Sequence, residues 1–154
     1  MDYCAHCKST TATLRCRGCH GVLYCNAEHQ KADWKNHKAT CKLLQKAAAG
    51  NGVEKVVHKE GTGPTPKYQQ SVRVKYAGRL PSGKQFDASD EFVFVVGAGQ
   101  VIKGWDIAVW DMHVGEEATV YITAECGYGH EGSPGAIPPD SPLVFDITLL
   151  EVIS

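Results

Sequence analysis

Hydrophobic and polar positions alternate along much of the chain after residue 53. In residues 71–80, SVRVKYAGRL, the apolar Val72 and Val74 alternate with the charged Arg73 and Lys75, as in a strand with one buried face. Similar segments at 92–96, 117–123 and 143–152 predict further strands. Residues 102–112 instead carry apolar side chains at roughly helical spacing, which predicts a helix. One helix among several antiparallel strands predicts an α+β fold.

The first third of the chain has a different pattern. Asn26 is a good helix cap, so a helix is expected to run from there to about His37, with a second short helix from about Cys41 to Ala49. Gly50-Asn51-Gly52 should end that second helix. We therefore expect a small domain at residues 1–46, a linker at 47–52 and a larger domain at 53–154. Such a linker would keep the two cores independent.

Cysteine is concentrated in the small domain, which holds six of the seven in the chain. Four of them form two C-x-x-C pairs, and each of the other two lies four residues from a histidine, a spacing that puts two ligands on one helix face. Eight such ligands in about forty residues predict two closed tetrahedral zinc sites, and metal would supply the folding free energy that so short a segment lacks. A disulfide framework would leave His29 and His37 unexplained.

Charge is divided between the two parts, although the whole chain is close to neutral at −1. Residues 1–46 carry eight basic and three acidic side chains, against eight and fourteen in residues 47–154. No arginine-rich or aromatic-interleaved stripe accompanies this modest positive charge, so nucleic-acid binding is not expected. No secretory signal or membrane-length apolar stretch is evident. Cysteines used as metal ligands then indicate the cytosol or the nucleus.

The ligand array C-x2-C, C-x2-C, C-x3-H, followed by Q-x3-W-x2-H-x3-C, resembles the MYND zinc finger across residues 4–41. Ligands interleave in that family. The resemblance therefore implies one zinc on Cys4, Cys7, Cys25 and His29, and a second on Cys16, Cys19, His37 and Cys41. His29 stands where the family usually has cysteine, and His6 and His20 are the alternatives for that position.

MYND fingers bind peptides, often ones that contain proline, and the resemblance makes Gln30 and Trp34 candidate peptide contacts. Trp34 has a second possible role, because an indole ring could simply cover the small metal core. DNA binding is not indicated, since no helix with base-reading side chains is evident.

Residues 53–154 resemble FKBP-type peptidyl-prolyl cis/trans isomerases. The matching motifs are, in chain order, VKYAG, GKQFD, FVF, VIKGWD, M-x-V-GE, YG, PGAIPP and LVFDITLLEV. The resemblance implies a curved antiparallel sheet wrapped around a short helix that starts near Lys103. It also implies proline-containing protein substrates and macrolide inhibitors of the rapamycin type.

The reaction that this resemblance implies needs neither a nucleophile nor a catalytic cofactor. Rotation about an X-Pro bond destroys amide resonance, with a barrier near 20 kcal/mol, and takes tens of seconds without a catalyst. A dry, mostly apolar aromatic cup can bind the twisted imide better than either planar isomer.

The resemblance assigns a role to each motif position. Trp105 is the expected floor beneath the prolyl ring, and the Ile102 N–H is expected to hold a substrate carbonyl. Asp87 would orient polar groups near the imide, and the Tyr128 hydroxyl would donate to a substrate carbonyl. The remaining lining positions are Tyr76, Phe86, Phe92 at the rim, Val101, Phe145 and, closing over the site from its loop, Ile137.

Several of these residues have structural alternatives. An ordinary hydrophobic core could equally contain Tyr76, Val101, Phe145 and Trp105, and Asp87 could cap a turn. The occurrence of all these residues together, in the order of the family motifs, favours the site.

Only residues 88–91 separate Asp87 from Phe92, fewer than is common in the family, so a reshaped rim and altered macrolide affinity are expected. Cys126 is expected to be a buried or half-buried free thiol. The functional alternative is a non-catalytic scaffold that binds proline-containing segments.

Overall fold

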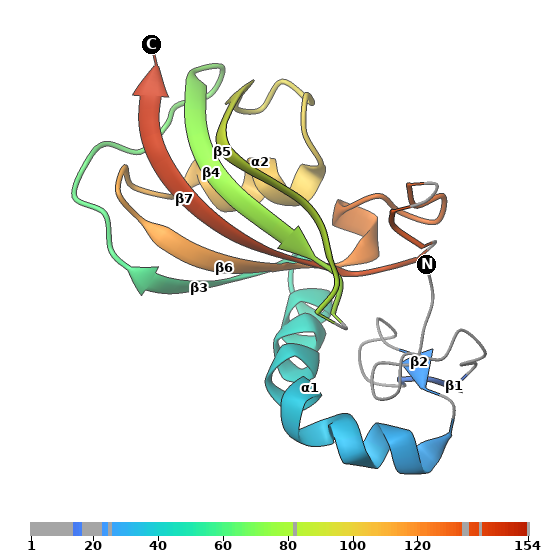
Figure 1. The fold of residues 1–154 in the computed structure, drawn as a ribbon. Coiled ribbons are helices and arrows are strands. Elements are labelled where there is room, and N and C mark those ends of the chain that lie inside the picture. The colour runs from blue at the N-terminus through green and yellow to red at the C-terminus, as the bar shows by residue number, and fades with distance from the viewer. Residues whose placement is uncertain are drawn as a thin grey trace.

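The computed structural model describes residues 14–16, 23–24, 26–81, 83–133, 136–138 and 140–153. These residues form a short two-stranded sheet, a long helix α1, and a five-stranded sheet curved around a second helix, α2 (Figure 1). The predicted α+β class is confirmed. None of the helices in this part of the chain is long and apolar enough to cross a membrane.

The large sheet contains every strand that the alternating pattern predicted. Its neighbours are antiparallel in the order β3-β6-β7-β4-β5. Val72 and Val74 of β4 are fully buried, as their alternation with charged residues requires. The strands are β3 (Val53–Lys59), β4 (Ser71–Arg79), β5 (Gln85–Val95), β6 (Glu117–Ile122) and β7 (Leu143–Ile153).

Strand β5 begins earlier than the hydrophobic pattern indicated. The apolar run at 92–96 predicts only its second half, whereas the polar residues from Gln85 onward also pair with β4. β5 lies at an edge of the sheet, where polar side chains face solvent at little cost. The pairing register shifts between Val74 and Tyr76, so the strand pair is irregular beside the aromatic residues described below.

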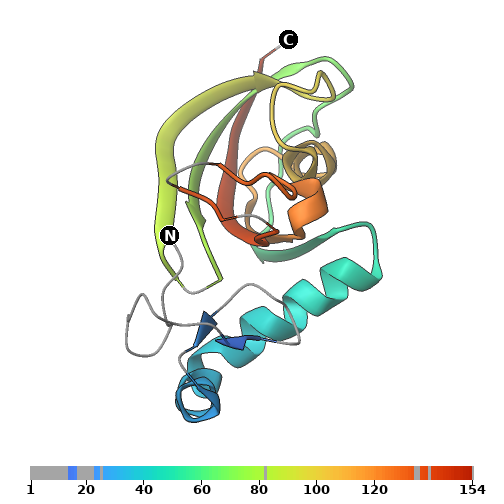
Figure 2. The ribbon, with the colours of Figure 1, turned by 90° about the vertical axis from the view of Figure 1, so that its right-hand side faces the viewer.

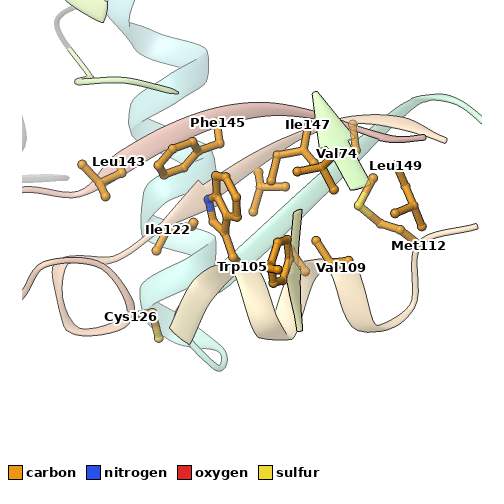
Figure 3. Close-up of a cluster of buried hydrophobic side chains, with 14 of the residues drawn as sticks. Val74, Trp105, Val109, Met112, Ile122, Cys126, Leu143, Phe145, Ile147 and Leu149 are labelled. Carbon is orange, nitrogen blue, oxygen red and sulfur yellow. The ribbon is translucent and has the colours of Figure 1, made fainter. Parts of the chain in front are cut away.

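Helix α2 (Lys103–Trp110) packs in the hollow of the curved sheet (Figure 2). Gly104 is what allows the close approach: a Cβ atom there would lie 2.7 Å from two side-chain carbons of Ile122 on β6. The next residue, Trp105, is therefore drawn into the core beside Phe145 (Figure 3). Val109 on the same helix and Met112, just after its end, are fully buried.

Helix α1 (Ala27–Ala49) is one continuous element, so the predicted break between His37 and Cys41 is wrong. Residues 38–40 contain neither glycine nor proline, and nothing in them interrupts the backbone hydrogen bonding. The Asn26 side chain caps the helix by accepting from the His29 N–H at 2.9 Å. The ribbon changes direction part of the way along its length (Figure 1). Strands β1 (Leu14–Arg15) and β2 (Leu23–Tyr24) pair beside it.

The segment predicted as a linker is partly helical and tied to the large domain. Residues 47–49 complete α1, which contacts β3 and β6. The N–H groups of Gly50 and Gly52 both donate to the carbonyl of Ala47, at 3.1 and 2.9 Å. Gly52 has a φ of +93°, and its carbonyl accepts from the Thr123 N–H at 2.9 Å. The two parts of the molecule thus meet through a defined turn.

Candidate active site and metal centre

A cavity of about 420 Å³ opens between α2, β4, β5 and the loop after β6. Eight of the ten positions expected in the catalytic site line it. They are Tyr76, Asp87, Phe92, Val101, Ile102, Trp105, Tyr128 and Phe145. The fold thus brings together residues that lie up to 69 positions apart in the chain.

The cup has an aromatic floor centred on Trp105, which is only 4% exposed. Its ring centroid lies 4.7 Å from that of Tyr76 and 5.2 Å from that of Phe145, both in edge-to-face geometry. Phe92 approaches from the rim, with its centroid 5.9 Å from Trp105. Edge-to-face contacts are a favoured geometry for aromatic pairs and stabilise this arrangement of the rings.

Tyr76 and Asp87 form the polar wall of the cup. The Tyr76 hydroxyl donates to Asp87 Oδ2 at 2.7 Å, and the backbone N–H of Ala88 donates to Asp87 Oδ1 at 2.9 Å. Both carboxylate oxygens are therefore held in place. Burial, followed by the hydrogen bond to Asp87, raises the pKa of Tyr76 far above its ordinary value.

Two hydrogen-bond donors in the cup have no acceptor among the residues that the structure describes. One is the backbone N–H of Ile102, just before the first turn of α2, and the other is the hydroxyl of Tyr128. Burial and, secondly, the negative Asp87 raise the pKa of Tyr128, so its hydroxyl keeps its proton well into the alkaline range. An apolar cup with two free donors suits a ligand that carries carbonyl groups on an apolar ring.

The other two expected residues do not line the cavity. Phe86 lies behind Phe145, with ring centroids 5.5 Å apart, and supports that wall. Their contact depends on Gly78, where a Cβ atom would lie 2.5 Å from Phe145 and 2.8 Å from Phe86. Ile137 is 5% exposed and belongs to the hydrophobic core. Its N–H and carbonyl both bond to Ser133, which shapes the loop rather than the cup.

Sequence reasoning missed Gln100, which also lines the cup. Its side-chain carbonyl accepts from the Val95 N–H at 3.0 Å and so ties the turn before α2 to the end of β5. The one clue in the sequence was that Gln100 directly precedes Val101 and Ile102, which were both expected in the site. A single glutamine after a glycine-rich turn does not by itself indicate a site residue.

The short segment between Asp87 and Phe92 is part of β5, with Ser89 opposite Tyr76. Within it, the Ser89 hydroxyl and the backbone of Glu91 exchange hydrogen bonds of 3.1 and 3.2 Å. Arg73 on the neighbouring strand pairs with Glu91 at 2.9 Å. This rim of the cup is therefore formed by the edge strand of the sheet rather than by a protruding loop.

The candidate metal centre combines Cys16, next to β1, with His37 and Cys41 of α1. All three side chains are buried, and their ligand atoms lie within 4.8 Å of one another. The two sulfurs are 3.8 Å apart. Two thiolates bound to one tetrahedral zinc at about 2.3 Å would lie about 3.8 Å apart, so this geometry fits zinc. It does not fit a disulfide, whose sulfurs are about 2.05 Å apart.

The surroundings of these three ligands also suit a metal. Burial lowers the pKa of His37, against the smaller opposing effect of Asp33, and so favours the neutral imidazole that metals bind. The side-chain amide of Gln45 donates to Cys41 Sγ at 3.3 Å, an outer contact that orients a ligand sulfur. Trp34 packs edge-on against His37, with centroids 6.0 Å apart, yet remains 40% exposed.

The other expected ligands are described only in part. Cys4, Cys7, Cys19 and Cys25 lie outside the described residues. His29 is half-buried in the first turn of α1, but its expected partners on the first zinc are among those four cysteines. Cys126, the remaining cysteine, is a buried free thiol as predicted.

The perturbed tyrosines predict an alkaline titration in two parts. Burial raises the pKa of Tyr76, Tyr121 and Tyr128, so these hydroxyls should ionise later in the folded protein than the ordinary value of about 10. Because the folded state then holds protons that the unfolded state releases, the free energy of unfolding should fall as pH rises through about 10. Ultraviolet titration of native and denatured protein measures this difference. A native curve that superimposes on the denatured one, or a late component unaltered by Tyr128→Phe, would contradict it.

Comparison with known proteins agrees with this geometry. Residues 63–150 match the family model described as FKBP-type peptidyl-prolyl cis-trans isomerase, and residues 4–41 match the MYND finger. "FK506-binding protein 1" of Gibberella zeae is 47% identical over 109 residues, which cover 66% of this chain and 98% of that protein. A "peptidyl-prolyl cis-trans isomerase" of Schizosaccharomyces pombe is 45% identical over 106 residues, with 66% and 95% coverage. The chain therefore belongs to the FKBP-type peptidyl-prolyl cis-trans isomerases and carries a MYND finger ahead of its isomerase domain.

Proposed function

We propose that the cup around Trp105 catalyses rotation about X-Pro bonds of protein substrates by holding the twisted imide. The observation that supports this assignment most directly is the pair of free donors, the Ile102 N–H and the Tyr128 hydroxyl, at the mouth of an aromatic cup. The prolyl ring would rest on Trp105, and the two donors would hold the carbonyls on either side of it. The Ile102 N–H belongs to the N-terminal cap of α2, so its direction is set by the helix before substrate arrives.

Each part of the cup has a distinct effect on the barrier. Apolar rings remove water from the imide, and a twisted imide loses less solvation than a planar, resonance-stabilised one. Asp87, held by Tyr76 and the Ala88 N–H, sets the orientation of polar groups beside the rotating bond. Phe86 acts through Phe145 and is a positioning residue. Macrolides of the rapamycin type are proposed inhibitors because they too present carbonyls around an apolar ring, with an affinity altered by the flat rim at residues 88–91.

Replacing the floor or the donor should reduce catalysis. Trp105→Ala is expected to lower kcat/KM by at least about ten-fold, and Tyr128→Phe by about ten-fold, since a transition-state hydrogen bond is worth about 1–1.5 kcal/mol. Phe86→Ala should have a smaller effect through Phe145. A proline-peptide isomerisation assay measures all three.

Trp110→Phe is the matched control for the floor, because Trp110 lies at the end of the same helix and is 49% exposed. It should retain full activity. Wild-type activity no higher than that of Trp105→Ala and Phe86→Ala would show that the reaction does not take place in this cup.

For the finger, we propose two structural zinc ions per chain. Cys16, Cys19, His37 and Cys41 would hold one, and Cys4, Cys7, Cys25 and His29 the other. The support is the fit of the three described ligands to tetrahedral zinc. Metal analysis of natively purified protein should give two zinc ions per chain, and His37→Ala should remove one. A wild-type stoichiometry near one would contradict the pairing.

We also propose that the protein resides in the cytosol or the nucleus, because thiolates that bind metal must stay reduced. A tagged chain found in the secretory pathway would contradict this location.

We also propose that the finger recruits substrates through a proline-containing peptide that contacts Gln30 and Trp34. Trp34 supports this proposal because it is 40% exposed while its edge is fixed against His37. An aromatic ring held at a surface is a common anchor for such peptides. Trp34→Ala should weaken binding of a proline-rich peptide to the full chain by about ten-fold, measured by calorimetry. Lys35→Ala is the control, because Lys35 is the exposed neighbour of Trp34. Equal losses of peptide affinity in the two variants would refute the contact.

A further inference from the structure

Helix α1 connects the metal centre to the isomerase domain without a break. His37 and Cys41 lie on it, and Leu44, less than one turn later, is 3% exposed. Leu44 and Ala48 form one side of a cavity of about 500 Å³, and Ala124, Glu125 and Cys126 form the other. The helix that carries two zinc ligands therefore also meets the isomerase domain directly.

The turn after α1 is hydrogen-bonded to the segment that contains the short helix η1 (Ala124–Cys126), which follows β6. The carbonyl of Gly52 accepts from the Thr123 N–H at 2.9 Å, and the Cys126 thiol donates to the Asn51 carbonyl at 3.5 Å. The fit is tight, because a Cβ atom on Gly52 would lie 2.5 Å from Cys126 Sγ. The turn at the end of α1 is thus in direct contact with η1.

Helix η1 in turn sets the position of Tyr128. The carbonyl of Ala124 accepts from the N–H groups of Gly127 and Gly129, at 3.0 and 2.8 Å. These two residues flank Tyr128, which lines the cup. A chain of hydrogen bonds thus runs from Ala47 through Gly52 and Thr123 to the backbone on both sides of Tyr128.

We propose that α1 is a positioning element for Tyr128, so that the state of the zinc finger adjusts the isomerase. Between α1 and η1 the connection consists of the hydrogen bonds of Asn51 and Gly52, since the cavity leaves side-chain packing between Leu44 and Ala124 incomplete. Incomplete packing lets the end of the helix shift at low cost. Binding of a partner or loss of metal at the finger would then change how firmly Tyr128 is held. The catalytic consequence rests on the donor role proposed above for Tyr128; the structural coupling does not.

Hydrogen exchange in the full-length protein tests the coupling. Leu44→Ala widens the cavity and is expected to speed exchange of the Gly127 and Gly129 amides by about five-fold or more relative to amides in β4. Leu43→Ala is the matched control, because Leu43 is a half-buried neighbour on the same helix that does not line the cavity. Ala48→Leu adds side-chain volume to the cavity and should slow the same two amides, which gives an answer even if Leu44→Ala does not fold. Chelation of the metal should act in the direction of Leu44→Ala.

A kinetic cycle follows the coupling into catalysis. Leu44→Ala should lower kcat/KM several-fold in the wild-type chain and have no further effect in a Tyr128→Phe background. Equal exchange at Gly127 and Gly129 in the Leu44→Ala and Leu43→Ala proteins, together with no change in Ala48→Leu, would overturn the coupling. Full activity in Tyr128→Phe would instead refute the donor role, and the exchange result would stand separately.

Discussion

The close approach of α2 to the sheet is the constraint on which the active site depends. A side chain at Gly104 would collide with Ile122, so only glycine lets the helix come this near to β6. Trp105 is then buried where Tyr76, Phe92 and Phe145 surround it. The same approach leaves the Ile102 N–H at the edge of that aromatic cluster. Hydrophobic packing thus builds the site as a by-product of completing the core.

The two parts of the molecule are stabilised by different means. The isomerase domain buries a continuous apolar cluster from β4, β5, β6, β7 and α2, against which Val53 of β3 packs. The finger has too few residues for such a core, and its buried Cys16, His37 and Cys41 stand where apolar side chains would otherwise lie. Helix α1 belongs to both arrangements, because its middle carries candidate metal ligands and it also contacts β3 and β6 of the isomerase domain.

Much of the lining of the cup could be predicted from motif order alone, including Asp87, Trp105 and Tyr128. The roles of Phe86 and Ile137 differ from expectation because side-chain direction depends on packing: Phe86 faces the back of Phe145, and Ile137 turns into the core. Gln100 was missed because its contribution is a hydrogen bond to Val95 that closes a turn. Contacts of this kind leave no periodic trace in a sequence.

The sequence by itself determined the fold class, the family of both parts and the ligand types of the finger. Alternation, ligand spacing and motif order are local or sequential properties, and they can be read without coordinates. Only the tertiary structure decided that α1 continues without a break to Ala49 and that Gly52 packs closely against Cys126. These features depend on which surfaces meet in space. A Gly-Asn-Gly segment is equally consistent with a free linker and a fixed turn until its distant hydrogen-bond partners, Thr123 and Cys126, are in place.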